Sequence, residues 1–153
     1  MKYLKLIALV FVASGLVLTT SCKKDNDDDQ SEKELTINAL VNGSWSIDDA
    51  SETDAAGVDL TAVTINFTAG SDVNFTLSGG DIENFVSGGS LTVSEAGALT
   101  ATITVVSEEL EAGSASATLN GTKTTFTLNF QTAESTSRVT GLGDYDLVFT
   151  LDQ

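Results

Sequence analysis

Residues 36–153 show a regular alternation of apolar and polar side chains, and this alternation constrains the fold more than any other feature of the sequence. Neighbouring side chains of a strand point to opposite faces of a sheet, so each alternating segment predicts a strand with one buried and one solvated face. Apolar residues alternate with Thr, Ser, Asn or Asp in eight segments, with Val148 the one exception, at 45–47, 63–67, 73–77, 91–93, 99–105, 115–119, 126–130 and 145–151. The sequence therefore predicts an all-β domain built from antiparallel strands.

The connections between these segments carry turn residues. The chain contains no proline, so Gly, Asn and Asp must set its turns. Asn120-Gly121 lies between two alternating segments and predicts a two-residue hairpin of type I′. Residues 69–72 predict a second hairpin. Helical turns are expected only at 81–85 and 107–111, which are too short to change the fold class.

Two architectures account for this succession of strands. The regular spacing favours an antiparallel up-and-down barrel, and a two-sheet β-sandwich is the alternative. Gly43-Ser44-Trp45 at the start of the first strand resembles the G-x-W opening of lipocalins and of lipocalin-like lipoprotein domains. That resemblance implies that Trp45 closes one end of a barrel. The chain lacks the T-D-Y motif of this family, and Arg138 precedes the last strand instead of following it.

Residues 1–21 have the composition of a signal peptide. Lys2 and Lys5 precede an apolar run over residues 6–18, which contains only two small interruptions. A membrane-spanning helix needs about 20 apolar residues, so this run is too short to remain as an anchor. We expect residues 1–21 to be removed and residues 36–153 to form a single domain.

The end of this segment, Leu18-Thr19-Thr20-Ser21-Cys22, resembles the lipobox of bacterial lipoproteins. The resemblance implies that Cys22, the only cysteine of the chain, receives a diacylglyceryl group and becomes an acylated N-terminus after cleavage. Leu18 lies four residues before the cysteine, where the family has this residue three before it. Two or more acyl chains anchor a protein stably, whereas one binds a membrane only marginally.

Residues 22–35 predict a lipidated cysteine followed by a disordered acidic tether. No apolar residue occurs between Lys23 and Glu34, so this tract cannot bury enough surface to offset its chain entropy. The tract resembles the acidic export signal of surface lipoproteins of the Bacteroidota. The residues that carry this resemblance are Lys23, Lys24, Asp25, Asp27, Asp28 and Asp29. It implies an outer-membrane lipoprotein that faces the cell surface.

Composition excludes several classes of function. Without residues 1–21, the chain has 22 acidic residues against five basic ones, a net charge of −17. Nucleic-acid binding through a basic face is therefore excluded. The absence of histidine and the single cysteine exclude histidine-based triads, thiolate or imidazole zinc sites and internal disulfides. We expect no cofactor.

Carboxylates are the remaining reactive groups. A glycan hydrolase would place two of them around a glycosidic bond and would need aromatic platforms for the sugar. Trp45 and Tyr145, the only Trp and Tyr beyond residue 21, both fall on apolar faces and are expected in the core. The sequence contains no catalytic constellation. The most acidic loop of the domain offers calcium candidates, because calcium prefers oxygen ligands: Asp48, Asp49, Asp54 and Asp59.

These observations predict a non-catalytic binding or accessory module, anchored to the membrane by lipid, which holds a small ligand or contacts an outer-membrane protein complex. One alternative is a carboxylate-based glycan hydrolase, with or without calcium. The other is a passive envelope component without a ligand. An apolar cavity of about 300 Å³ or more inside the domain would favour a ligand site, and a filled interior would favour the passive component.

Overall fold

The structure is a computed structural model that describes residues 30–53, 58–106, 108, 110–134 and 143–152. Two groups of predictions lie outside these residues. The first is the signal peptide, together with Cys22 and the tether residues Lys23, Lys24, Asp25, Asp27, Asp28 and Asp29. The second is the calcium candidate Asp54.

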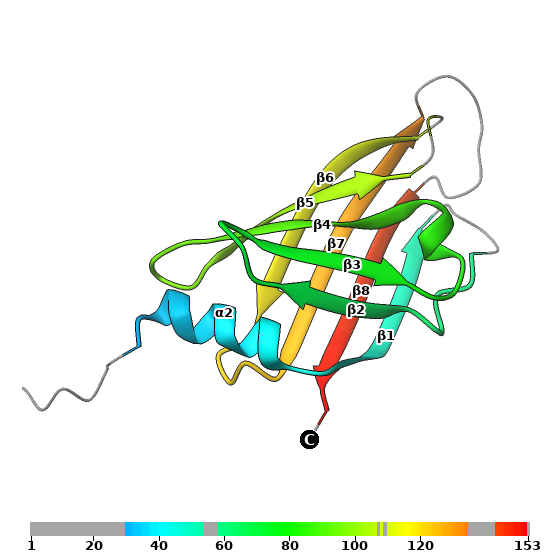
Figure 1. Ribbon diagram of the computed structural model, residues 1–153. Coiled ribbons are helices and arrows are strands. Elements are labelled where there is room, and N and C mark those ends of the chain that lie inside the picture. Colours follow the sequence, from blue (N-terminus) through cyan, green and yellow to red (C-terminus); the bar gives the residue numbers. More distant parts are fainter. Residues whose placement is uncertain (1–29, 54–57, 107, 109, 135–142, 153) are drawn as a thin grey trace, which may run out of the picture.

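Eight antiparallel strands form one sheet that curves into a nearly closed barrel (Figure 1). The all-β prediction is confirmed, and of the two architectures the barrel is the one observed. The strands are β1 (Trp45–Thr53), β2 (Thr64–Thr68), β3 (Val73–Ser78), β4 (Val86–Val93), β5 (Leu99–Val105), β6 (Leu110–Leu119), β7 (Thr125–Glu134) and β8 (Gly143–Leu151). Each strand coincides with or contains one of the alternating segments of the sequence, apart from Val63, which lies just before β2. This agreement arises because the period of two depends only on residues within one segment.

The strand order is β5-β4-β3-β2-β1-β8-β7-β6, so strands that are consecutive in the sequence pair with each other except β5 and β6, and β1 also pairs with β8. This is an up-and-down barrel whose seam lies between β5 and β6, which run close together. β1 and β2 share a single register pair, Ser46 with Thr64. The sheet therefore bends sharply there, and β2 and β3 cross the direction of β7 and β8 (Figure 1).

The inner faces of the strands fill the barrel with apolar side chains. Phe126, Phe130, Tyr145 and Phe149 are almost completely buried. The rings of Phe130 and Tyr145 stack at a centroid distance of 4.8 Å. Offset aromatic pairs of this kind add stability beyond the area they bury.

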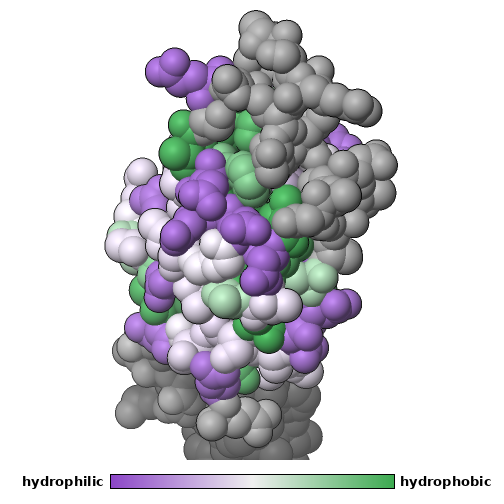
Figure 2. Space-filling view, turned by 90° about the vertical axis from the view of Figure 1, so that its right-hand side faces the viewer, coloured by the Kyte–Doolittle hydropathy of each residue, from purple (hydrophilic) through white to green (hydrophobic). Residues whose placement is uncertain are grey.

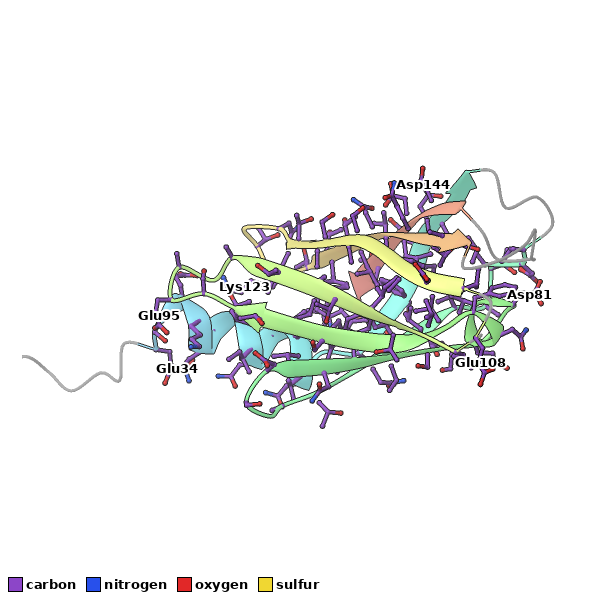
Figure 3. The ribbon with its side chains drawn as sticks, turned by 90° about the horizontal axis from the view of Figure 1, so that it is seen from above. Glu34, Asp81, Glu95, Glu108, Lys123 and Asp144 are labelled. Atoms are coloured by element: carbon purple, nitrogen blue, oxygen red, sulfur yellow. The ribbon has the colours of Figure 1, made fainter. Side chains whose placement is uncertain are left out.

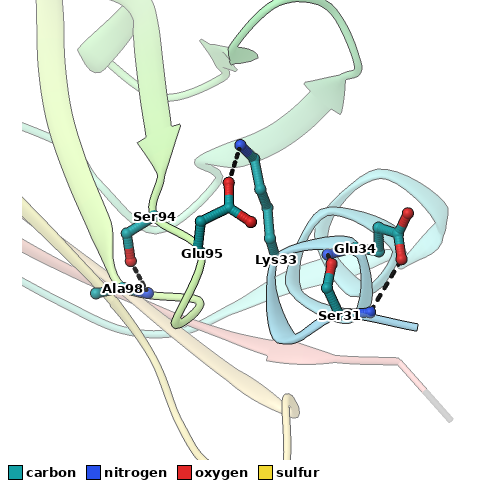
Figure 4. Close-up of polar contacts among 6 residues, drawn as sticks. All are labelled: Ser31, Lys33, Glu34, Ser94, Glu95 and Ala98. Carbon is teal, nitrogen blue, oxygen red and sulfur yellow. Dashed lines mark hydrogen bonds and ion pairs between the residues drawn. The ribbon is translucent and has the colours of Figure 1, made fainter. Parts of the chain in front are cut away.

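A helix that the sequence analysis did not predict, α2 (Glu32–Asn42), covers one end of the barrel (Figure 1). Ser31 caps it: its Oγ accepts a hydrogen bond from the backbone N–H of Glu34 at 3.2 Å, and the Glu34 carboxylate accepts one from the backbone N–H of Ser31 at 2.9 Å (Figure 4). Thr36 and Leu40 are buried against the barrel. The helix takes in residues 32–35, which the sequence analysis had assigned to the tether.

Two hairpins contact α2 through ion pairs. Lys33 lies 2.9 Å from Glu95 in the β4–β5 connection (Figure 4), and Lys123 in the β6–β7 connection lies 3.1 Å from Glu32. Such exposed pairs contribute little energy, so burial of Leu40 is the main attachment. Within the described residues, no helix is long and apolar enough to span a membrane.

The hairpin predicted at Asn120-Gly121 is present, but its turn is not of type I′. Five residues, 120–124, connect β6 to β7, and the backbone N–H of Lys123 donates to the carbonyl of Asn120 at 2.9 Å. The positive φ, 58°, falls on Lys123. The Asn120 side chain accepts hydrogen bonds from the N–H groups of Thr124 and Thr125 at 2.7 and 3.1 Å, which stabilises this longer loop.

The other local predictions can be compared directly with the structure. β2 and β3 form the predicted hairpin, with Thr68 opposite Asn74. The helical turn predicted at 81–85 is the short 3₁₀ helix η1 (Ile82–Asn84). The turn predicted at 107–111 lies partly outside the described residues, and its last two positions already belong to β6.

Candidate functional site

Trp45 lies at the end of the barrel that α2 covers. Its ring is 5% exposed and packs edge-on against Phe67 and Phe126 at centroid distances of 6.2 and 6.3 Å. Its Nε1–H donates to the backbone carbonyl of Leu40 at 3.1 Å. Trp45 therefore joins the helix to the aromatic core, and the hydrogen bond satisfies the one polar atom that burial would otherwise leave unpaired.

Three of the four calcium candidates line one surface hollow of about 460 Å³. Asp48 lies where the register of β1 with β8 shifts, Asp49 follows it, and Asp59 lies across the hollow. The described residues contain no group of three or more acidic, Cys or His side chains that could hold a metal ion. The fourth candidate, Asp54, is outside these residues.

Asp59 is already engaged within its own loop. Its Oδ1 accepts hydrogen bonds from the hydroxyl and the backbone N–H of Thr61 at 2.7 and 2.9 Å, and these bonds lower the pKa of Asp59. Its backbone N–H donates to the Asp81 carboxylate at 2.8 Å. The arrangement closes a turn, because these contacts all connect neighbouring loop segments.

A second hollow, of about 370 Å³, lies over the outer face of β6, β7 and β8. Its floor is formed by Ala115, Phe130 and Tyr145, of which the two aromatic side chains are buried in the core. We call this feature the polar hollow and define it by its six exposed polar side chains, Ser114, Ser116, Asn129, Gln131, Asp144 and Asp146.

The strand register arranges these six side chains in two parallel rows. Ser116 is opposite Asn129, and Asn129 is opposite Asp146. In the second row, Ser114 donates its hydroxyl hydrogen bond to the Gln131 side-chain oxygen at 2.7 Å, and Gln131 is opposite Asp144. Each row thus runs hydroxyl, carboxamide, carboxylate across the three strands. The rows are two residues apart, roughly 7 Å along the strand.

A bulge in β6 builds one wall of the polar hollow. The register between β6 and β7 shifts between Ala112 and Ala115, and such bulges bend a strand and re-aim its side chains. At Gly113 an added Cβ would lie 2.9 Å from the Cβ of Gln131 and 3.0 Å from its carbonyl oxygen. Glycine therefore permits the close approach that brings Ser114 to Gln131.

The polar hollow carries negative charge without a nearby cation among the described residues. The only Lys and Arg residues that the structure describes are Lys33 and Lys123, and both pair with glutamates of the α2 end. Figure 3 shows Lys123 near α2 and Asp144 toward the opposite end. In the described part of the chain, the carboxylates of Asp144 and Asp146 also accept no side-chain hydrogen bond.

One further face of the molecule can be compared with these two hollows. Figure 2, which faces the right-hand side of Figure 1, shows mostly hydrophilic and intermediate residues with small, separated hydrophobic areas. A broad exposed apolar patch would indicate a protein or membrane contact, and none is visible on this face.

The polar hollow offers hydrogen-bonding groups, and the hydroxyl of Ser114 is paired with an amide and not with a base. The Ser114 hydroxyl donates to an amide oxygen, and a neutral amide cannot act as the general base that a serine nucleophile needs. Serine and carboxamide groups both donate and accept hydrogen bonds, while carboxylates accept them. The six groups together can hold a ligand that carries several N–H or O–H donors.

Sequence reasoning missed this site. The alternation of residues 115–119, 126–130 and 145–151 shows only which of their side chains face solvent. The grouping depends on the register of three strands and on the β6 bulge, for which Gly113 is the only local sign.

No protein-family description, curated protein or solved structure matches the chain.

Proposed function

We propose that this protein is a surface-exposed lipoprotein of the outer membrane that acts as a non-catalytic binding or accessory module. Support for the anchor comes from the sequence: a basic and apolar segment over residues 1–21, Cys22 in a lipobox-like context, and an acidic tract behind it. In the sequence that tract precedes α2, which covers one end of the barrel, whereas the polar hollow lies on the outer face of β6, β7 and β8.

The observation that carries the binding function is the polar hollow itself. It combines a volume of about 370 Å³ with six exposed hydrogen-bonding side chains from three adjacent strands. The barrel interior is occupied by packed side chains such as Phe126, Phe130 and Tyr145. We therefore assign the ligand site to the outer face of the barrel, in place of the interior site that a lipocalin-like domain would use.

The filled interior also favours a second candidate, the passive envelope component. This candidate shares the lipid anchor and differs only in having no ligand. Binding measurements on the polar hollow therefore separate the two, whereas experiments on the anchor test what they have in common.

The anchor is tested by intact-mass measurement and by protease treatment of whole cells. The expected mature mass begins at Cys22 with added acyl chains, and external protease removes the domain from intact cells. A Cys22→Ala variant should lose the acyl mass and leave the membrane fraction, while a Ser71→Ala control in the β2–β3 turn should behave as the parent. An unmodified chain cleaved elsewhere, or a domain protected in intact cells, would overturn the proposal.

A further inference from the structure

We propose that the polar hollow binds aliphatic polyamines, with ammonium groups on Asp144 and Asp146 and further N–H donors on Asn129 and Gln131. This inference rests on the proposed binding function and deepens it by naming the ligand class. The feature that points to it is the repeat of one pattern, hydroxyl, carboxamide, carboxylate, in two rows across β6, β7 and β8.

The spacing of the carboxylates suits a molecule with two amines. Asp144 and Asp146 are two residues apart on β8 and both are exposed on its outer face, which sets their Cβ atoms roughly 7 Å apart. Two amines joined by four methylene groups lie about 6 Å apart when the chain is extended. A diamine can therefore place one ammonium group on each carboxylate without bending.

The other groups of the rows complete the recognition of an ammonium ion. An alkylammonium group carries three N–H donors and no acceptor, so it needs several oxygen atoms around it. Each row offers a carboxylate and a carboxamide oxygen on neighbouring strands, about 5 Å apart at the Cβ atoms. Hydrogen bonds with a charged partner are about twice as strong as neutral ones.

Charge complementarity selects a cation. The domain has a large acidic excess, and the two lysines that the structure describes are both paired at the α2 end. The carboxylates of the polar hollow are thus free of protein cations within the described chain. An organic cation fits better than a metal ion, because the oxygen atoms are spread along two rows and form no group of three or more acids.

A neutral glycan fits less well. Sugars are held by aromatic faces as well as by hydrogen bonds, and the aromatic rings nearest to the polar hollow are Phe130 and Tyr145. Both side chains are buried, 2% exposed, and stack on each other. The outer face therefore offers hydrogen bonds and charge without a stacking platform.

The proposal is tested by calorimetric titration of the purified, cell-processed protein with spermidine in about 150 mM salt, where exposed charges are screened beyond about 8 Å. The variant Asp144→Asn/Asp146→Asn should bind at least tenfold more weakly. The variant Asp48→Asn/Asp72→Asn removes the same number of charges elsewhere and should bind as the parent does. Asn129→Leu should bind several-fold more weakly, and thermal melts confirm that each variant is folded.

A ligand series sharpens the test. Butylamine, which has one amine, should bind at least tenfold more weakly than 1,4-diaminobutane, and calcium ions should not displace spermidine. If the two double variants bind spermidine equally weakly, the binding is a general electrostatic attraction to an acidic protein, and the proposal is overturned. Absence of binding, or displacement by calcium, would also overturn it. The mass and protease experiments test the lipid anchor independently of these binding measurements. Failure of the ligand assignment can therefore be distinguished from failure of the anchor.

Discussion

The two faces of β6, β7 and β8 carry opposite kinds of side chain on the same backbone. On the inner face, Phe126, Phe130 and Tyr145 are buried and pack against one another or their neighbours. On the outer face, one position away along each strand, Asn129 and Asp146 are exposed and face solvent. Because side chains alternate strictly along a strand, the residues of the core and those of the proposed ligand site occupy interleaved positions, and substitutions can alter one set while sparing the other.

The largest expected effect comes from the inner face. Phe130→Ala removes a buried ring that stacks on the ring of Tyr145. We therefore expect the free energy of unfolding to fall by about 3–5 kcal/mol. Urea denaturation measures this. Asn129→Ala, the adjacent position on the outer face, should change stability by no more than about 0.5 kcal/mol. Similar losses for both substitutions would contradict the separation of the two faces.

A smaller loss is expected at the β6 bulge, where both faces depend on the backbone. In Gly113→Ala the new Cβ would lie 2.9 Å from Gln131, so β6 must move away from β7, with an expected cost of about 1–3 kcal/mol. Gly121→Ala is the matched control, since an added Cβ there meets nothing within 4 Å. Denaturation curves of the two variants should differ clearly. If they coincide, the bulge adapts freely and does not shape the polar hollow.

The cap of α2 should have a moderate effect, because it acts at the end of the barrel and not on either face. Ser31→Ala removes the side-chain acceptor for the N–H of Glu34, and such changes cost about 1 kcal/mol. The melting temperature should fall, while spermidine binding stays unchanged. Restoration by Ser31→Asp, another good capping residue, would identify the cap as the cause. A weakening of ligand binding would show that the two ends are coupled.

The smallest effect concerns pH. Asp152 accepts hydrogen bonds from Ser46 and, at 2.8 Å, from Ser44, and these bonds lower its pKa in the folded protein. A lowered folded-state pKa contributes stability above the unfolded pKa, and this contribution is lost as the pH falls through the folded value. Melting temperatures measured from neutral pH downward should therefore fall slightly less in Asp152→Asn. The variant Ser44→Ala/Ser46→Ala should show the same flattening, and an unchanged acid response in both would refute this role.

The strands were predictable because their signal is local. Segments such as 63–67 and 126–130 alternate without interruption, and a period of two has no other regular interpretation. The helix α2 was missed although Ser31 and Glu34 have the spacing of a capping box. The acidic tract before it suggested that the polar composition continued through residue 35, and burial of Leu40 against the barrel, which stabilises the helix, is a tertiary contact.

The site was less predictable than the fold for the same physical reason. Asp144 and Asp146 belong to one strand, so their common face follows from the sequence. Their grouping with Asn129 and Ser116 follows from the register between the strands. The bulge in β6 shifts this register, and the residues that form the bulge do not show a clear alternation of apolar and polar side chains. The turn at Asn120 shows the same limit on a small scale: the dipeptide predicts a two-residue turn, and side-chain hydrogen bonds select a longer one.

The sequence by itself determined the fold class, the number of strands, which positions face the core and the exclusion of histidine-based triads and of thiolate or imidazole zinc sites. Each of these depends on residue identity or on spacing within one segment. The closure of the strands into a barrel, the placement of α2 over one end and the assembly of the polar hollow were decided only by the tertiary structure. They depend on which strands pair and in what register, and pairing energies come from contacts between residues that are distant in the chain.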